Sequence, residues 1–155
     1  NVCEQSGQDF FREFDFAFGC LDNLGARLQL NSYCYNIVPL IDSGTYAFAG
    51  RVQSVSAPSS CLECSVSRED YKSMWLKYSC EGEPLDFLDP KTPAIASTTT
   101  ITAGIAVNDF LKQLFRLEDH LAGRALHYNG LAGEAKIFYV QKRRNCPVHE
   151  VEQKI

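Results

Sequence analysis

Two short clusters of soft metal ligands constrain the fold of this chain more than any other feature. Cys61 and Cys64 form a CxxC pair, and Cys146 and His149 form a CxxH pair close to the other end. Each pair has the spacing with which one loop can hold a zinc ion through two side chains. If both pairs hold the same ion, the set of four ligands is closed, which is typical of structural zinc. The alternative is four reduced thiol or surface groups that never meet.

The composition suits one soluble domain in a reducing compartment. The chain has 155 residues, 45% of them apolar and 22% charged, which is ordinary for a globular protein with a sizeable core. Its seven cysteines are an odd number, and three belong to the ligand pairs, so we expect a cytoplasmic location rather than a disulfide framework. The net charge of −4 predicts no nucleic-acid partner. No apolar run approaches the roughly 20 residues that span a bilayer, so we expect no membrane partner.

Alternating strand and helix patterns in the first part of the chain predict an α/β fold. The aromatic-rich apolar run 14–21 has the length of a buried strand, and Asp22 and Asn23 after it are good helix-capping residues. Gly50 lies within a strand pattern, which indicates a bulge or a close backbone approach. The predicted elements are a strand at 14–21, a helix at 24–35, a strand at 37–41, a turn at 43–45 and a strand at 46–55.

The second part of the chain continues the alternation. Three prolines and several acidic residues between 80 and 93 predict a mobile crossover loop. Small residues at 103, 104 and 106 would let a helix pack closely on a sheet. The predicted elements are a short helix at 68–78, a long helix from 97 to about 117, and strands at 126–128 and 136–140 joined by a glycine-rich turn.

Asp22 and Arg27 lie where an α/β sheet binds ligands, beyond the carboxyl end of a strand. A carboxylate at the position of Asp22 can hold a divalent cation that bridges nucleotide phosphates. A role as helix cap alone explains the same residue. Arg27, one turn into the helix, is placed to pair with a phosphate or with Asp22, or to form a salt bridge on the helix surface.

The other cysteines and histidines give weaker indications. Cys80 lies in the loop that we expect to be mobile, but three acidic neighbours would raise its pKa and argue against a nucleophile. Cys20 and Cys34 lie on apolar faces and are expected in the core. His120 and His127 are isolated, so a surface or hydrogen-bonded core role is expected. No GxSxG, HExxH, P-loop or GxGxxG motif occurs.

Several of these segments together resemble one family. The stretch FDFAFGCLDNLGARLQLNSYC, followed by PLIDSGTYAFAGRVQ, is similar to the ThiF/MoeB/HesA and ubiquitin-activating-enzyme family. The later STTTITAGIAVNDFLKQL looks like a helix of that family, and the resemblance runs from about Phe14 to His149. The matching residues in the first two stretches are Asp22, Asn23, Ala26, Arg27, Asn31, Pro39, Leu40, Ile41, Ser43, Gly44, Thr45, Gly50 and Val52.

The resemblance implies a Rossmann-like activating-enzyme domain that binds MgATP and adenylates the C-terminal glycine of a ubiquitin-like or sulfur-carrier protein. Asp22 matches the aspartate that contacts Mg²⁺ and the ATP phosphates, with Asn23 and Arg27 as further nucleotide-binding residues. The two ligand pairs match the family's zinc site, with His149 in place of the more usual fourth cysteine. Cys80 lies roughly where some members have a thioester-forming cysteine.

The family's Gly-rich phosphate loop has no counterpart here, because little sequence precedes Phe14. We therefore expect residues 1–155 to form one partial domain, the C-terminal half, with an exposed parallel sheet edge and little activity alone. An N-terminal nucleotide-binding half or a homologous subunit would complete it. The alternative is a binding module that docks a ubiquitin-like protein or a complete homologue without chemistry. A zinc-ribbon scaffold unrelated to activation is a third reading.

Overall fold

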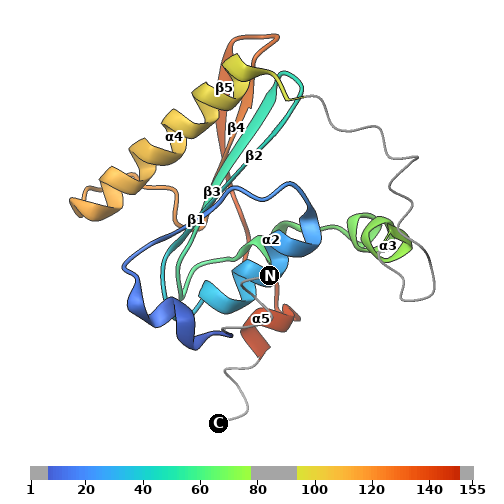
Figure 1. Cartoon of the computed structure of the whole chain (residues 1–155), viewed down its shortest axis with the longest axis vertical. Helices are drawn as coiled ribbons and strands as arrows, with labels where there is room; N and C mark the ends of the chain where they lie inside the picture. Colours follow the sequence, from blue (N-terminus) through green and yellow to red (C-terminus); the bar gives the residue numbers. More distant parts are fainter. Residues whose placement is uncertain (1–6, 78–93, 151–155) are drawn as a thin grey trace.

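One five-stranded sheet organises the computed structural model, which describes residues 7–77 and 94–150 (Figure 1). The strands follow one another in sequence order across the sheet. The first pair of strands is parallel and the other three are antiparallel, so the sheet is mixed and the predicted α/β fold is confirmed. The elements are η1 (Asp9–Glu13), β1 (Ala17–Gly19), α2 (Leu24–Cys34), β2 (Leu40–Tyr46), β3 (Ala49–Val55), η2 (Leu62–Ser65), α3 (Arg68–Lys77), α4 (Ala96–Leu114), β4 (Arg124–Asn129), β5 (Glu134–Tyr139) and α5 (Pro147–Glu150).

The predicted start of α2 is confirmed. Asn23 is the N-cap, and its side-chain oxygen accepts a hydrogen bond from the Ala26 backbone N–H at 2.8 Å. The strand before it is shorter than the predicted 14–21, because only Ala17–Gly19 pair with β2. Phe14 instead remains half-exposed outside the sheet.

The predicted turn at 43–45 is wrong, since β2 runs through these residues to Tyr46. The chain reverses after Tyr46, where Ala47 takes a positive φ of 47°. Gly44 lies inside β2 against Arg27 rather than in a turn: a Cβ at this position would lie 2.7 Å from Nη1 of Arg27, so the guanidinium would have to shift. The strand predicted from residue 37 also begins later, at Leu40, directly after Pro39.

Helix α4 covers one face of the sheet over β2 and β3. The predicted close approach at Gly50 is confirmed, because a Cβ there would collide with Thr102 of α4. The carboxylate of Asp109 links α4 to β3 and to the segment before β4, because it accepts hydrogen bonds from the Ser54 hydroxyl and the Leu121 backbone N–H. The small core on this side contains Ile41, Val52, Ala106 and Leu121.

The opposite face of the sheet packs on α2, η2 and the segment before α5. This side holds the larger core, which contains Phe11, Leu28, Cys34, Tyr35, Val38, Leu40, Val55, Cys61, Leu62 and Cys146. The prediction that Cys34 belongs to the core is confirmed. The same prediction for Cys20 is wrong: Cys20 follows the last residue of β1 and is exposed.

The remaining elements agree with the sequence in kind. Strands β4 and β5 form the late hairpin, with Gly133 in its turn at φ 68°, and all six residues of β5 are exposed. Helix α3 is confirmed, whereas the loop predicted at 80–93 lies outside the described residues. Within the described ranges β1 pairs with β2 alone and so forms a parallel edge, as expected. No described helix has both the length and the apolar composition needed to cross a membrane.

Candidate functional site

The two ligand pairs meet in space. Cys61 and Cys64 lie at the start and inside of η2, and Cys146 and His149 lie at α5. The four donor atoms all lie within 4.8 Å of one another. Sγ of Cys61 is 3.9 Å from Sγ of Cys64 and 3.6 Å from Sγ of Cys146, and both ring nitrogens of His149 are 3.9 Å from Sγ of Cys64.

This cluster fits a tetrahedral metal ion. With zinc–sulfur bonds of about 2.3 Å, two thiolates of a tetrahedral site lie about 3.8 Å apart. The observed sulfur separations of 3.6 and 3.9 Å bracket that value. Three sulfurs and one imidazole nitrogen are also the donor types that zinc prefers. These four side chains therefore lie close enough together to hold one ion.

Neighbouring groups hold the cluster in place. The Asn31 side-chain oxygen accepts a hydrogen bond from the Leu62 N–H at 3.1 Å, which ties α2 to η2. The Arg143 backbone N–H points at Sγ of Cys64 at 3.4 Å, and the Tyr35 ring lies 4.7 Å from the His149 ring. Contacts of this kind orient metal ligands in known sites.

Burial raises the pKa of the Cys61 thiol well above its ordinary value; Asn31 opposes the shift, and nearby Cys64 and Cys146 add to it. Burial likewise raises the pKa of the Cys146 thiol. Thiols that are this reluctant to ionise are poor nucleophiles by themselves. A bound cation would lower the pKa of these thiols, because it stabilises the thiolate form directly.

A second site lies at the carboxyl end of β1 and β2. A pocket of about 430 Å³ opens there, and Asp22 and Arg27 both line it. Asp22 is exposed, and its Oδ1 accepts a hydrogen bond from the Asn23 side-chain amide at 3.2 Å. The other lining residues are Cys20, Leu21, Ser43, Gly44, Thr45, Tyr46, Ala94, Thr99, Thr102 and Ala103. The sequence thus correctly grouped Asp22 and Arg27 at one strand end.

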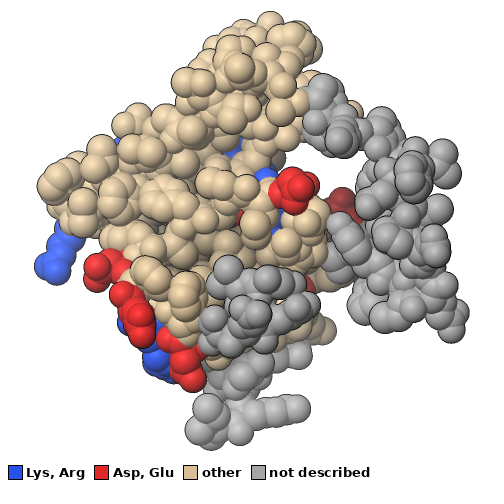
Figure 2. All heavy atoms as spheres, viewed as in Figure 1, with Lys and Arg blue, Asp and Glu red and all other residues tan. Residues whose placement is uncertain are grey.

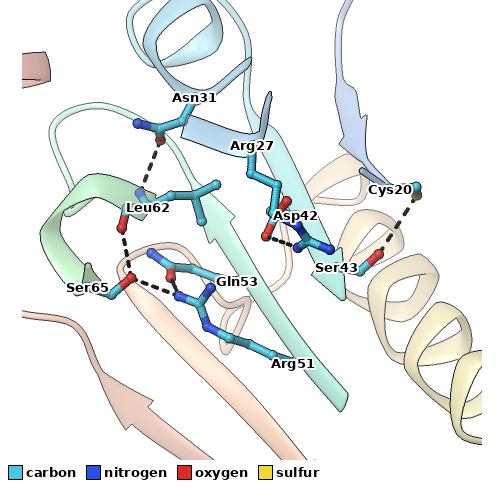
Figure 3. A network of polar contacts seen from close by, with 9 residues as sticks. All are labelled: Cys20, Arg27, Asn31, Asp42, Ser43, Arg51, Gln53, Leu62 and Ser65. Atoms are coloured by element: carbon cyan, nitrogen blue, oxygen red, sulfur yellow. Dashed lines mark hydrogen bonds and ion pairs between the residues drawn. The ribbon is translucent and has the colours of Figure 1, made fainter. Parts of the chain in front are cut away.

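Arg27 has a partner that the sequence did not reveal. Its Nη1 donates to Oδ2 of Asp42 at 2.9 Å, and the two side chains are 19% and 1% exposed (Figure 3). Two glycines make room for this ion pair. A Cβ on Gly44 would meet the Arg27 guanidinium, and a Cβ on Gly19 would lie 2.7 Å from Oδ1 of Asp42.

A separate network of polar contacts lies beside this ion pair and leads through η2 toward the cysteine cluster (Figure 3). Burial raises the pKa of Asp42, and the positive charges of Arg27 and Arg51 oppose the rise. Arg51 bonds Gln53 and, at 2.9 Å, the hydroxyl of Ser65 in η2 (Figure 3). The sequence missed Asp42, Arg51 and Gln53; Arg51 and Gln53 lie on either side of Val52 in β3, which was a signal for these two alone.

The other candidate site residues named in the sequence analysis are Cys80, His120 and His127. Cys80 lies outside the described residues. His120 accepts a hydrogen bond from the Ala122 N–H at 3.2 Å, and the ring of His127 packs 5.1 Å from that of Phe138. The expectation that neither belongs to a site is consistent with these local contacts.

Together these features define an α/β domain with a pocket at its strand ends and a four-residue cluster of metal-ligand type. The ThiF family matches residues 1–148, and the chain belongs to this family.

Curated relatives are similar to part of the chain. The SUMO-activating enzyme subunit 2 of Dictyostelium discoideum is 38% identical over 60 residues, which are 37% of this chain and 9% of that protein. The ubiquitin-activating enzyme E1-like protein of Saccharomyces cerevisiae is 40% identical over 58 residues, or 36% and 9%. The NEDD8-activating enzyme E1 catalytic subunit of Dictyostelium discoideum is 30% identical over 78 residues, or 41% and 18%.

Solved structures share the fold. The crystal structure of E. coli MccB with ATP superposes with a TM-score of 0.66 at 14% identity, covering 93% of this chain and 42% of that one. MccB in complex with N-formylated MccA gives a TM-score of 0.63 at 15% identity, covering 93% and 44%. The chain therefore spans less than half the length of the structures that it matches.

Proposed function

We propose that this chain forms the C-terminal half of an ATP-dependent activating enzyme, which adenylates the terminal carboxylate of a ubiquitin-like protein, a sulfur carrier or a related peptide. The curated relatives that match are subunits of activating enzymes, and a structure with the same fold was solved with ATP. The observation that carries the proposal is the pocket in which Asp22 and Arg27 meet at the ends of β1 and β2.

The charges in this pocket suit MgATP and a carboxylate. Asp22 is exposed at the rim, so its carboxylate can face a hydrated Mg²⁺ at little desolvation cost. Arg27 also lines the pocket and carries a positive charge; Asp42 accepts a hydrogen bond from one of its nitrogens, and the guanidinium keeps further donors. When bound, MgATP supplies the adenylyl group that activates the acceptor carboxylate.

Three residues of this chain would then act in the reaction. Asp22 positions Mg²⁺, and Asn23 orients the Asp22 carboxylate through the 3.2 Å hydrogen bond. Arg27 neutralises a phosphate or the incoming carboxylate, which lowers the repulsion between two anions. The chain contains no GxGxxG run, so a second polypeptide or another segment would supply the phosphate loop. Cys80 remains a candidate thioester acceptor under the same proposal.

We also propose that Cys61, Cys64, Cys146 and His149 hold a structural zinc ion. The matching separations of the donor atoms and the burial of Cys61 and Cys146 support this assignment. All four positions of a tetrahedral site would be protein ligands, so this ion would stabilise the fold without reaching substrate.

ATP–pyrophosphate exchange by the complete assembly tests the catalytic proposal. We expect Asp22→Ala to abolish exchange and to leave the zinc content unchanged. Asp15→Ala is the matched control, because Asp15 is an exposed aspartate outside the pocket. Unchanged exchange by Asp22→Ala would remove this residue from the metal role. No exchange by any assembly of wild-type chain, together with retained binding of a ubiquitin-like protein, would favour the binding-module alternative.

A further inference from the structure

A second cavity, of about 530 Å³, lies beside α2 on the cysteine-containing face of the sheet. Residues of η1, α2, η2, α3 and α5 line it, and it shares no residue with the pocket that contains Asp22 and Arg27. The proposed adenylation therefore makes no use of it. Its walls include Leu28, Tyr33, Ile37, Glu63, Tyr71 and Val148.

Glu63 brings a buried negative charge to this cavity. The residue is 6% exposed, and no described residue donates a hydrogen bond to its carboxylate. The positive charge of Arg143 acts on Glu63, but the two form no ion pair, and Nη1 of Arg143 donates to the Val66 carbonyl at 3.3 Å instead. A buried carboxylate without a donor is costly, so such groups normally bind a partner. Glu63 therefore has the capacity to accept hydrogen bonds from a ligand in the cavity.

The walls of the cavity suit a flat cation. The side chains of Tyr33 and Tyr71 provide aromatic rings, and Leu28 and Ile37 provide apolar surface. The Tyr71 hydroxyl is buried and makes no hydrogen bond with any described residue. A guanidinium is planar, stacks on aromatic rings and can donate two parallel hydrogen bonds to one carboxylate such as Glu63. An ammonium is a compact, strongly hydrated charge and uses the ring faces less well.

The charges at the rim of the cavity do not oppose a cation. Arg12 is the one positive side chain among the lining residues, and its Nε donates to Oδ1 of Asp9 at 3.1 Å. This pair faces solvent, since the two side chains are 67% and 92% exposed. Helix η1 also contains Glu13, so its two acidic residues outnumber Arg12. In Figure 2 acidic and basic side chains are mixed at the lower left, where Figure 1 places η1.

We propose that this cavity binds a guanidinium group carried on an apolar stem, with Glu63 as its anionic partner and the rings of Tyr33 and Tyr71 as stacking surfaces. The guanidinium would supply the donors that the Glu63 carboxylate lacks. Ser32 and Asn36 also line the cavity and are exposed, so they can bond polar atoms at the other end of the stem. The arginine side chain of a peptide and a small alkylguanidine both carry this chemistry.

A titration of the purified chain with N-acetyl-arginine amide, followed through backbone amide NMR shifts, tests the proposal. We expect saturable shifts with a dissociation constant of about 1 mM or below. N-acetyl-citrulline amide is the matched ligand control, because it has nearly the same shape without the charge, and it should bind at least about tenfold more weakly. The absence of saturable shifts, or equal binding of the citrulline compound, would overturn the proposal.

Butylguanidine distinguishes the two sources of the ligand. If it binds as tightly as the arginine amide, the guanidinium and its stem account for recognition, which supports a free alkylguanidine. If the arginine amide binds more tightly, the peptide groups contribute, which supports the arginine of a peptide. Both results support the site itself.

Two variants test the residues of the site. Glu63→Gln should raise the dissociation constant about tenfold or more, because it removes the anion. Glu69→Gln is the matched control, since Glu69 is an exposed glutamate of α3 outside the lining. Glu63 lies between Cys61 and Cys64, so the metal content and melting temperature of Glu63→Gln are compared with wild type first.

Tyr71→Ala is the second variant, because Tyr71 lies on α3 and belongs to no metal-ligand pair. It should raise the dissociation constant about fivefold through loss of a stacking surface. Wild-type affinity in a folded Glu63→Gln chain, or in Tyr71→Ala, would overturn the proposal.

Discussion

The two faces of the sheet differ in how completely they are buried. The cysteine side is the face that packs on α2, η2 and the segment before α5, and the α4 side is the face covered by α4. On the cysteine side, Cys61, Cys146 and Leu62 are at most 3% exposed, and the four ligand atoms converge from two segments far apart in the sequence. On the α4 side, the buried core is smaller, the helix carries an exposed apolar stripe, and β5 is exposed along its whole length.

The difference separates stability from association. On the cysteine side a bound metal would hold the four ligand atoms together, so this side would gain folding stability from the ion. The α4 side leaves apolar surface in contact with water, which favours binding to another surface. Substitutions on the first side should therefore change folding, and substitutions on the second should change assembly.

Among the substitutions that test this difference, Cys146→Ser is expected to have the largest effect on stability. Removing one of four ligands gives up most of the folding free energy linked to the metal, so we expect a loss of several kcal/mol or failure to fold. Bound zinc by mass spectrometry and the melting temperature are the two measurements. Cys20→Ser is the control, because Cys20 is exposed and outside the cluster. A Cys146→Ser chain that keeps its zinc and its melting temperature would contradict the structural metal site.

Asp42→Ala should be the next most damaging change. It leaves the Arg27 guanidinium, which is 19% exposed, without its carboxylate partner, and we expect a loss of about 3 kcal/mol in the free energy of unfolding. Urea unfolding measures it. The exposed pair of Lys136 and Glu134 provides the comparison, since Glu134→Ala should cost less than about 1 kcal/mol. Equal effects of the two variants would show that the buried pair has no special weight.

Two leucines compare the two sides directly. Leu28 of α2 is 8% exposed in the larger core, whereas Leu111 of α4 is 38% exposed. Leu28→Ala should lower the free energy of unfolding by about 2–3 kcal/mol and Leu111→Ala by about 1 kcal/mol or less. Chemical denaturation of both variants in parallel gives the difference. A larger loss for Leu111→Ala would reverse the proposed division between stability and association.

The smallest predicted effect is local to α3. Ser67 and Asp70 form a reciprocal cap, with hydrogen bonds of 3.0 Å from each backbone N–H to the other side chain. Ser67→Ala should destabilise this helix by about 1 kcal/mol, seen as faster amide exchange in α3 only. These hydrogen bonds lower the pKa of Asp70 below its ordinary 3.8, so their contribution is present above that pH and lost as the pH falls further. Amide exchange in α3 that is insensitive to acidification below pH 3.8 would contradict this cap.

Short-range patterns were sufficient to predict most elements and the cysteine cluster. Asn23 caps α2, Gly50 admits α4, and the two ligand pairs converge, each as local spacing suggested. These features depend on residues a few positions apart or on chemistry that only one partner set can satisfy.

The features that the sequence failed to predict depend on packing between residues far apart in the chain. Ser43, Gly44 and Thr45 have the composition of a turn, but they lie inside β2, where the Arg27 guanidinium packs across Gly44. Asp42 and Arg51 are on the same face of the sheet only through the register of β2 with β3. Cys20 is exposed because β1 ends at Gly19, one residue before it.

The distance along the chain between the two ligand pairs has a consequence for synthesis. Cys64 and His149 are 85 positions apart. At 5–20 residues per second, a ribosome needs roughly 4 to 17 s to make the intervening chain. During that time the first two thiols exist without their partners, and every strand of the sheet is made before the fourth ligand emerges. Closure of the cluster is thus a late event that follows translation of the whole sheet.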